Sequence, residues 1–181
     1  MKKTAPATAG KTPKTAAPRV GAAAKPGSDP RVAIAKPEDL DDVRAMFREY
    51  AQGIGAFHCL DGFEEEACGL PGDYAAPKGR LLIARAGRKA AGCVGVRPLQ
   101  GGACEMKRLY IRPAFRGKGL GRALVERALA EAKKAGYRRV QLDTLPNMRE
   151  ALMLYAVLGF TSVEPYLPNP TPGALCFEKA L

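Results

Sequence analysis

A basic, glycine-rich turn lies at residues 112–124, RPAFRGKGLGRAL, directly before an apolar helical pattern. Glycine removes the Cβ that would keep backbone N–H groups away from a phosphate. The start of a helix adds unpaired N–H donors and the positive end of the helix dipole. Arg116, Lys118 and Arg122 add formal positive charge. The turn therefore predicts a binding site for a diphosphate.

Several glycine motifs could explain this turn. A P-loop is excluded, because the one GK[ST] triplet lies at 10–12 and Ala5 stands where its first glycine should be. A dinucleotide-binding fingerprint stays open: the glycines read G-x-G-x-G, and Asp143 follows 22 residues after Gly121, where a ribose-binding acid would stand. A tight turn without ligand stays open as well.

A third pattern, [RQ]-x-x-G-x-[GA], is matched throughout by residues 116–121, RGKGLG. Downstream, MREALMLYAVLGF contains A-x-x-x-Y-x-x-x-G-F, formed by Ala151, Tyr155, Gly159 and Phe160. With these two signatures the chain resembles the GNAT family of N-acetyltransferases over residues 31–181. The resemblance implies an α/β fold: a mixed sheet that splays between its fourth and fifth strands, flanked by about four helices.

The same resemblance implies acetyl-CoA as the donor substrate. Its pantetheine arm would pair with the backbone of β-strand residues 109–111, and its diphosphate would lie on the amides of residues 117–122. Relatives often place an asparagine seven residues before the tyrosine; here Met148 occupies that position and Asn147 is shifted by one. The predicted donor-binding residues are Leu109, Tyr110, Ile111, Arg116, Gly117, Lys118, Gly119, Leu120, Gly121, Arg122 and Asn147.

Two residues are predicted to catalyse the transfer. The family pattern assigns Tyr155 as the acid that protonates the departing thiolate, although the residue would also suit a packed helix face. Glu105 is the predicted base, because strand alternation places it on one face with Leu109 and Ile111. It could equally form an ion pair with Lys107 or Arg97 on the sheet surface. Lesser candidates for the base are Asp143 and the single histidine, His58.

The elements that must position these residues follow from hydrophobic periodicity. Strands are expected at 31–35, 81–87, 90–99, 103–111, 137–143, 160–163 and 174–178. Helices are expected after Pro37, around 63–70, at 120–135 and at about 148–158. Acceptor-binding segments are expected at 47–75 and 164–173, where aromatic residues alternate with acids, a composition that would suit a cationic or aromatic amine.

The whole chain has 181 residues with 46% hydrophobic and 26% charged content, typical of a globular protein. No apolar run reaches the ~18–20 residues of a membrane span, and we expect a cytoplasmic protein. Residues 1–30 read as a disordered Lys/Ala/Pro tail; six of the 29 lysines and arginines, and none of the 18 acids, lie within 1–28. The five scattered cysteines indicate no metal site and no disulfide framework.

The expected reaction is transfer of the acetyl group of acetyl-CoA to a primary amine of a small-molecule or amino-acid-like acceptor, by direct attack in a ternary complex. A protein or peptide amine is an alternative acceptor. A different class is also open: a nucleic-acid-associated factor that uses its basic tail and retains a CoA-sensing domain. The sequence leaves the oligomeric state open, a homodimer included.

Overall fold

The computed structural model describes residues 1, 29, 31–54, 62–168 and 172–181. Most of the predicted tail, together with His58 and Cys59, lies outside these described residues. The elements run in the order β1 (Val32–Ile34), α1 (Leu40–Gly53), α2 (Phe63–Cys68), β2 (Arg80–Ala86), β3 (Lys89–Pro98), β4 (Ala103–Ile111), α3 (Leu120–Lys134), β5 (Arg139–Thr144), α4 (Arg149–Val157), β6 (Thr161–Val163) and β7 (Leu175–Ala180). Short 3-10 turns lie at Pro37–Asp39, Gly72–Tyr74, Gln100–Gly102 and Pro113–Phe115.

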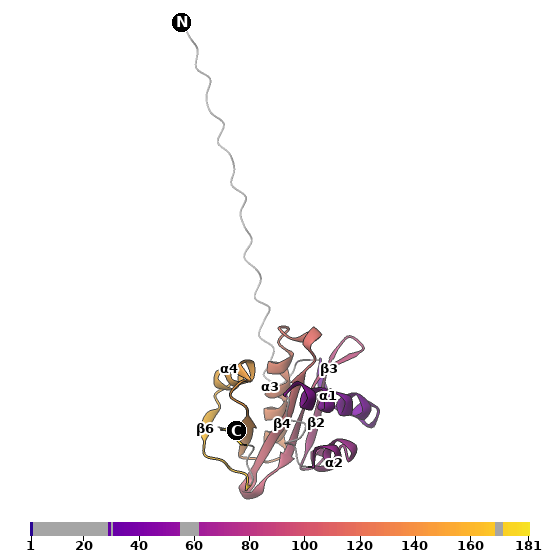
Figure 1. Ribbon diagram of the computed structural model, residues 1–181, viewed down its shortest axis with the longest axis vertical. Coiled ribbons are helices and arrows are strands. Elements are labelled where there is room, and N and C mark those ends of the chain that lie inside the picture. The colour runs from indigo at the N-terminus through magenta and orange to yellow at the C-terminus, as the bar shows by residue number, and fades with distance from the viewer. Residues whose placement is uncertain (2–28, 30, 55–61, 169–171) are drawn as a thin grey trace.

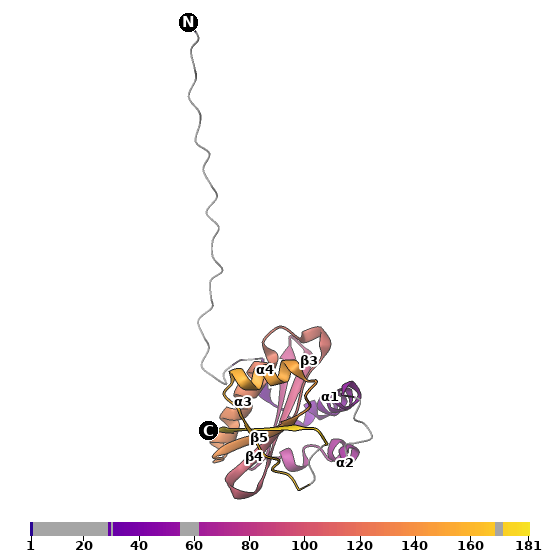
Figure 2. The same ribbon diagram turned by 60° about the vertical axis from the view of Figure 1, so that its left-hand side comes forward.

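The strands form one seven-stranded sheet in the order β1-β2-β3-β4-β5-β7-β6. Every neighbouring pair is antiparallel except β4 and β5, which are parallel, as the β-α-β unit around the glycine turn predicts. Helices α1 and α2 cover one face of the sheet, and α3 and α4 cover the other (Figure 1, Figure 2). The predicted mixed α/β fold is confirmed.

Each face of the sheet has its own hydrophobic core. On the α3 side, Leu120, Leu124 and Ala128 follow the helical period of α3 and pack against the buried residues of β2 to β5. On the α1 side, Val43, Phe47 and the residues of α2 pack against the opposite face of β2 and β3. The two cores hold the central strands rigidly from both sides, so that the ends of β4 and β5 have fixed positions.

Strands β4 and β5 separate after a short paired region. Their pairing covers only Ala103–Glu105 against Arg139–Gln141, whereas β5 stays paired with β7 along its whole length. From Met106 to Ile111, β4 therefore has no strand partner on its β5 side among the described residues. The predicted splay is present, and it leaves backbone N–H and C=O groups of β4 available to a ligand.

A β-bulge in β4 changes which side chains share a face. Tyr110 lies opposite Cys93, but Lys107 lies opposite Gly95, so two residues of β4 face one residue of β3. Arg108 in the bulge has a φ of +58°, a left-handed conformation that is uncommon for a side chain of this size. Cys104, Met106, Leu109 and Ile111 consequently pack toward α3 and α4.

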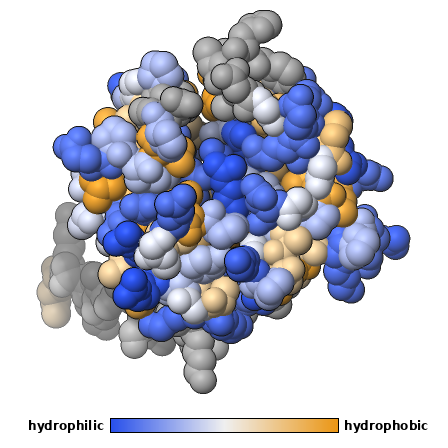
Figure 3. All heavy atoms as spheres, turned by 90° about the horizontal axis from the view of Figure 1, so that it is seen from below, coloured by the Kyte–Doolittle hydropathy of each residue, from blue (hydrophilic) through white to orange (hydrophobic). Residues whose placement is uncertain are grey.

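Figure 3 shows one face of the molecule coloured by hydropathy. Hydrophilic and hydrophobic side chains alternate over the coloured part of this face, and hydrophilic residues occupy much of its centre. No helix of the described residues is long and apolar enough to cross a membrane.

Candidate active site

The glycine turn leaves space in front of the first turn of α3. Gly117 and Gly119 have φ values of +72° and +76°, which favour glycine, and a Cβ built on either would meet no atom within 4 Å. Gly119 is the N-cap residue of α3 and provides no side chain to the first N–H groups of the helix. No side chain of Gly117 or Gly119 therefore keeps an anion from these N–H groups, which suits anion binding at a helix start.

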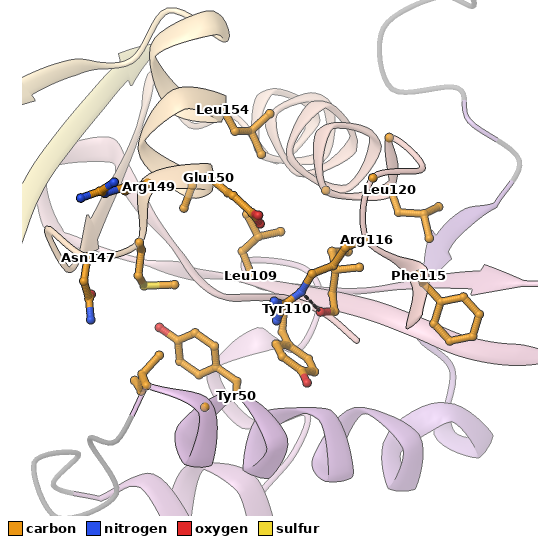
Figure 4. Close-up of a pocket in the computed structure, with 18 residues that line it drawn as sticks. Tyr50, Leu109, Tyr110, Phe115, Arg116, Leu120, Asn147, Arg149, Glu150 and Leu154 are labelled. Atoms are coloured by element: carbon orange, nitrogen blue, oxygen red, sulfur yellow. Dashed lines mark hydrogen bonds between the residues drawn. The ribbon is translucent and has the colours of Figure 1, made fainter. Parts of the chain in front are cut away.

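A large cavity of about 590 Å³ opens from this turn toward the splay between β4 and β5. In Figure 4, Tyr50 rises from α1 on one side of the cavity, and Glu150 and Leu154 reach toward it from α4 on the other. Arg116 lies between them, where its Nε donates to the carbonyl oxygen of Ile111 at 3.1 Å. Its lining includes residues of the glycine turn and residues 109–111 of β4, so the cavity connects the turn with the open edge of the strand.

Most of the predicted donor-binding residues share the lining of the large cavity. Those that do are Leu109, Tyr110, Ile111, Arg116, Gly117, Gly119, Leu120, Gly121 and Asn147. Lys118 and Arg122 are outside the lining: Lys118 Nζ donates to the carbonyl oxygen of Ala114 at 3.2 Å, and Arg122 pairs with Glu126 at 2.7 Å. The structure shows that nine of the predicted residues lie around one cavity. The role of all eleven in binding the donor stays a prediction.

The remaining lining residues were not predicted to bind the donor: Tyr50, Gly53, Ile54, Phe115, Met148, Arg149, Glu150, Ala151 and Leu154. A signal for them existed in the sequence. Positions 150, 151 and 154 lie on one face of α4, and positions 50 and 53 lie on one face of α1. Met148, at the position where relatives often have asparagine, and the preceding residue Asn147 both line this cavity.

A small cavity of about 60 Å³ adjoins the large one and contains the predicted acid. The two share Tyr50, Ile54, Leu109 and Met148 as lining residues. Tyr155 lines only the small cavity, where its ring packs against Phe160 with 5.5 Å between ring centroids. Burial, with lesser contributions from Tyr50 and Asp143, raises the pKa of Tyr155 well above its ordinary value. The phenol therefore stays protonated and can donate a proton or a hydrogen bond.

Asp143, at the end of β5, lines the same small cavity as Tyr155. Among the described residues it forms no ion pair and accepts no side-chain hydrogen bond. The sequence analysis predicted this residue as a weaker candidate for the base than Glu105. The structure instead makes it the carboxylate that shares a cavity with the tyrosine.

Glu105 lies in a different environment from the one that strand alternation predicted. Its side chain is 0% exposed, and it accepts hydrogen bonds from Arg97 Nε at 2.7 Å and from the hydroxyl of Tyr166 at 2.9 Å. The expectation that it shares a face with Leu109 and Ile111 is wrong, because the bulge at Arg108 reverses the alternation between them. Glu105 lines neither cavity, and its role as base stays a prediction.

The comparisons with known proteins agree with this geometry. Residues 40–160 match the model of the acetyltransferase (GNAT) family. The chain belongs to the GNAT family of acetyltransferases. It is 39% identical to an uncharacterized N-acetyltransferase of Schizosaccharomyces pombe, over 83% of this chain and 94% of that protein. It is also 28% identical to an uncharacterized N-acetyltransferase of Dictyostelium discoideum, over 78% of this chain and 94% of the relative.

Solved structures show the same fold. A GNAT-family acetyltransferase from Staphylococcus aureus superposes with a TM-score of 0.71 at 12% identity and covers 82% of this chain and 97% of its own. An N-acetyltransferase from Thermoplasma acidophilum, solved in complex with coenzyme A, superposes with a TM-score of 0.66 at 18% identity, over 83% and 98% of the two chains. At these identities the likeness concerns the fold alone.

Four of the aromatic and acidic residues in the expected acceptor-binding segments have structural roles in this acetyltransferase. Phe47, Phe63 and Tyr74 are 0–3% exposed and belong to the α1-side core. Glu66 accepts two hydrogen bonds from Arg108, at 2.9 and 2.7 Å. Burial alone would raise the pKa of Glu66, but the hydrogen bonds and charge of Arg108 outweigh it and hold the pKa below its ordinary value. A free acidic surface for a cationic amine is therefore absent at Glu66.

The three buried cysteines among the described residues are poor nucleophiles. Cys93, Cys104 and Cys176 are buried, and burial raises the pKa of Cys104 to about 12. A thiol with such a pKa stays protonated near neutral pH. Within the described ranges, no group of three or more His, Cys, Asp or Glu side chains could hold a metal ion.

Proposed function

We propose that this GNAT acetyltransferase transfers the acetyl group of acetyl-CoA directly to the primary amine of a small-molecule or amino-acid-like acceptor, in a ternary complex. The observation that carries the proposal is the contact between the two cavities along the open edge of β4. The large cavity begins at the glycine turn, where a diphosphate fits, and the small cavity contains a protonated tyrosine and a carboxylate.

The fit of acetyl-CoA follows from the residues of the chain. The first N–H groups of α3 and the two left-handed glycines provide donors to a diphosphate without side chains in the way. The unpaired stretch of β4 provides backbone groups to an extended amide-bearing arm. A backbone N–H on that edge, directed at the thioester carbonyl, would stabilise the oxyanion that forms during attack.

The chemistry then proceeds by direct attack. The neutral amine nitrogen forms a bond to the thioester carbonyl carbon, and the carbon–sulfur bond breaks. Asp143 receives the proton of the attacking amine, directly or through water, and Tyr155 donates a proton or a hydrogen bond to the departing thiolate. We prefer Asp143 to Glu105 as base because Asp143 lines the cavity with Tyr155, whereas both oxygens of Glu105 already accept hydrogen bonds.

An acetyl-cysteine route has no support in the described residues. Cys93 and Cys104 belong to the hydrophobic cores, and burial and nearby carboxylates raise the pKa of Cys176. Cys68, which is exposed, lies on α2 outside both cavities. Attack without a covalent enzyme intermediate is therefore the simpler path.

The decisive experiment is calorimetric titration of the full chain with acetyl-CoA, followed by a panel of amines and short peptides read by thiol release. We expect saturable acetyl-CoA binding and thiol release that depends on an added small amine. Absence of binding at high micromolar acetyl-CoA would refute the proposal. Release with peptides alone would assign a protein or peptide acceptor instead.

A further inference from the structure

A buried cluster of charged residues on the α1 side of β4 contains more cations than carboxylates. Its cations are Arg97, Lys107 and Arg108, and its carboxylates are Glu66 and Glu105. All five side chains are at most 27% exposed. Because buried charges are costly without partners, the cation in excess requires an explanation.

Both carboxylates of the cluster already accept hydrogen bonds on each of their oxygens. Besides the two bonds from Arg108, Glu66 accepts a hydrogen bond from the hydroxyl of Tyr74 at 2.6 Å. Glu105 accepts one hydrogen bond on each oxygen, from Arg97 and from the hydroxyl of Tyr166. Arg97 and Arg108 therefore neutralise the two carboxylates, and Lys107 is the cation that remains.

Lys107 has hydrogen-bond donors to spare. Its Nζ lies 3.6 Å from Glu105 Oε1, which is beyond hydrogen-bond length, and its side chain is 16% exposed. Among the described residues it makes no hydrogen bond, although an ammonium carries three donors. A largely buried ammonium in this state gains substantially from an anionic ligand, because such bonds are charge-assisted.

Lys107 lines the small cavity together with Asp143 and Tyr155. Asp143, as noted above, has no ion pair among the described residues. The cavity thus combines an ammonium without hydrogen bonds and a carboxylate without a counter-ion, next to the proposed acid. A ligand with one cationic and one anionic group complements both.

We propose that Lys107 binds a carboxylate of the acceptor, so that the acceptor is an amino acid or a similar amine that carries a carboxylate. The inference rests on the proposed function and names its substrate class. The amine nitrogen lies toward Asp143 and Tyr155, and the carboxylate lies toward Lys107. A simple alkylamine would leave Lys107 without an anion, and a polyamine would bring a second cation against it.

The test compares α-amino acids with their own carboxamides, using side chains that are apolar, polar and charged. The two members of each pair differ only at the carboxylate. The amine of the carboxamide is the less basic one, so preference for the acid cannot come from a larger fraction of neutral amine. We compare use as kcat/KM per neutral amine, and on this measure we expect the intact protein to favour acids by roughly 10- to 100-fold, the value of a charge-assisted hydrogen bond.

The variant Lys107→Met keeps the length of the side chain and removes its charge. It should remove the preference for acids, mainly through KM, because kcat/KM falls much further for the acids than for the carboxamides. Lys107→Arg should retain the preference, and Lys133→Met, at an exposed position in the last turn of α3, serves as a matched control that changes neither substrate. A purely structural lysine would lower both activities together.

Donor binding separates failure of this inference from failure of the proposed function. Acetyl-CoA titration should give the same affinity for the intact protein and all three variants. Loss of binding in the intact protein would overturn the proposed function. If the donor binds normally, three results would overturn the carboxylate site alone. These are equal use of acids and carboxamides, no use of any amino acid, and a preference for acids that is unaltered in Lys107→Met.

Discussion

The two sides of the splay are built in opposite ways. On the donor side, the large cavity is lined by residues of three short stretches of chain, 50–54, 109–121 and 147–154, and a Cβ built on Gly117 or Gly119 would meet open space. On the acceptor side, charged side chains from distant parts of the chain meet in a buried cluster, where arginines and tyrosines already bind the two carboxylates.

This difference indicates how the two sites recognise their ligands. A diphosphate and an extended arm are the same in every reaction of this type, so a site of backbone N–H groups serves them without special side chains. An acceptor must be distinguished from other amines, and a fixed cluster in which Lys107 makes no side-chain hydrogen bond among the described residues can discriminate by charge. The donor side should therefore be sensitive to shape, and the acceptor side to charge.

The largest effect is expected at the glycine turn. Gly119→Val places a branched side chain at a φ of +76° and into the space in front of the α3 N-terminus. We expect acetyl-CoA affinity to fall by at least about 100-fold, measured by calorimetry.

Gly136→Val provides a matched control for that change. Gly136 has a φ of +87° and open space around its Cβ, but it follows the opposite end of α3 and lines neither cavity. Both variants should lose a similar ~1–3 kcal/mol of stability from backbone strain. If Gly136→Val weakened acetyl-CoA binding as much as Gly119→Val, the loss would reflect strain and the turn would not bind the diphosphate.

A second prediction concerns Tyr155, which lies where the two sides meet. Tyr155→Phe keeps the ring that packs against Phe160 and removes only the hydroxyl. Turnover should fall by about 100-fold, the usual value of a general acid, while acetyl-CoA affinity stays constant. Tyr137→Phe is the control, because the Tyr137 hydroxyl donates to the backbone carbonyl oxygen of Lys78 and lies outside both cavities. This variant should leave turnover unchanged.

The pH profile sharpens the assignment of Tyr155. Because burial raises its pKa, the protonated form persists above pH ~10, where an ordinary tyrosine begins to ionise. Turnover at saturating substrates should therefore show no decline due to this group between pH 8 and ~10. A decline centred near pH 10 that disappears in Tyr155→Phe would mean that the hydroxyl is exposed to water during catalysis.

The glycine turn and half of the residues that line the large cavity could be predicted from the sequence, whereas the contacts of the acceptor side could not. The glycine turn and the tyrosine lie within signatures that local spacing defines, and helical periodicity gave the elements that carry them. Contacts on the acceptor side join residues far apart, such as Arg108 with Glu66, 42 positions away, and Tyr166 with Glu105, 61 positions away. No local pattern indicates such pairs.

The error at Glu105 has a specific physical cause. Alternation along a strand assumes one residue of β4 for each residue of β3, and the bulge at Arg108 adds one. Glu105 and Leu109 therefore lie on opposite faces. The side chain of Arg108, anchored by Glu66 and stacked on Phe63 at 5.1 Å, holds the unusual φ in place, and none of these partners is near it in sequence.

A third prediction contrasts the two carboxylates on the acceptor side. Asp143→Asn should lower kcat by about tenfold or more with little change in thermal stability, because this carboxylate has no ion pair to lose among the described residues. Glu105→Gln should do the reverse and cost about 2–3 kcal/mol of stability, because Arg97 loses its charged partner in a buried position. Thermal denaturation and steady-state kinetics on both variants separate the roles. A large loss of kcat in a stable Glu105→Gln protein would restore Glu105 as the base.

The smallest effect is expected at Gly121, inside the first turn of α3. A Cβ built there lies 3.7 Å from Leu154 and 3.8 Å from Ile111, ordinary contact distances, so Gly121→Ala should fit without strain. Alanine in place of a helical glycine should stabilise the fold by about 0.5–1 kcal/mol. The same methyl group narrows the large cavity beside the open edge of β4, and acetyl-CoA affinity should fall several-fold. At this residue the stability of the fold should therefore rise while acetyl-CoA affinity falls, because the donor site depends on shape. Unchanged affinity in the stabilised variant would show that the donor does not reach this part of the cavity.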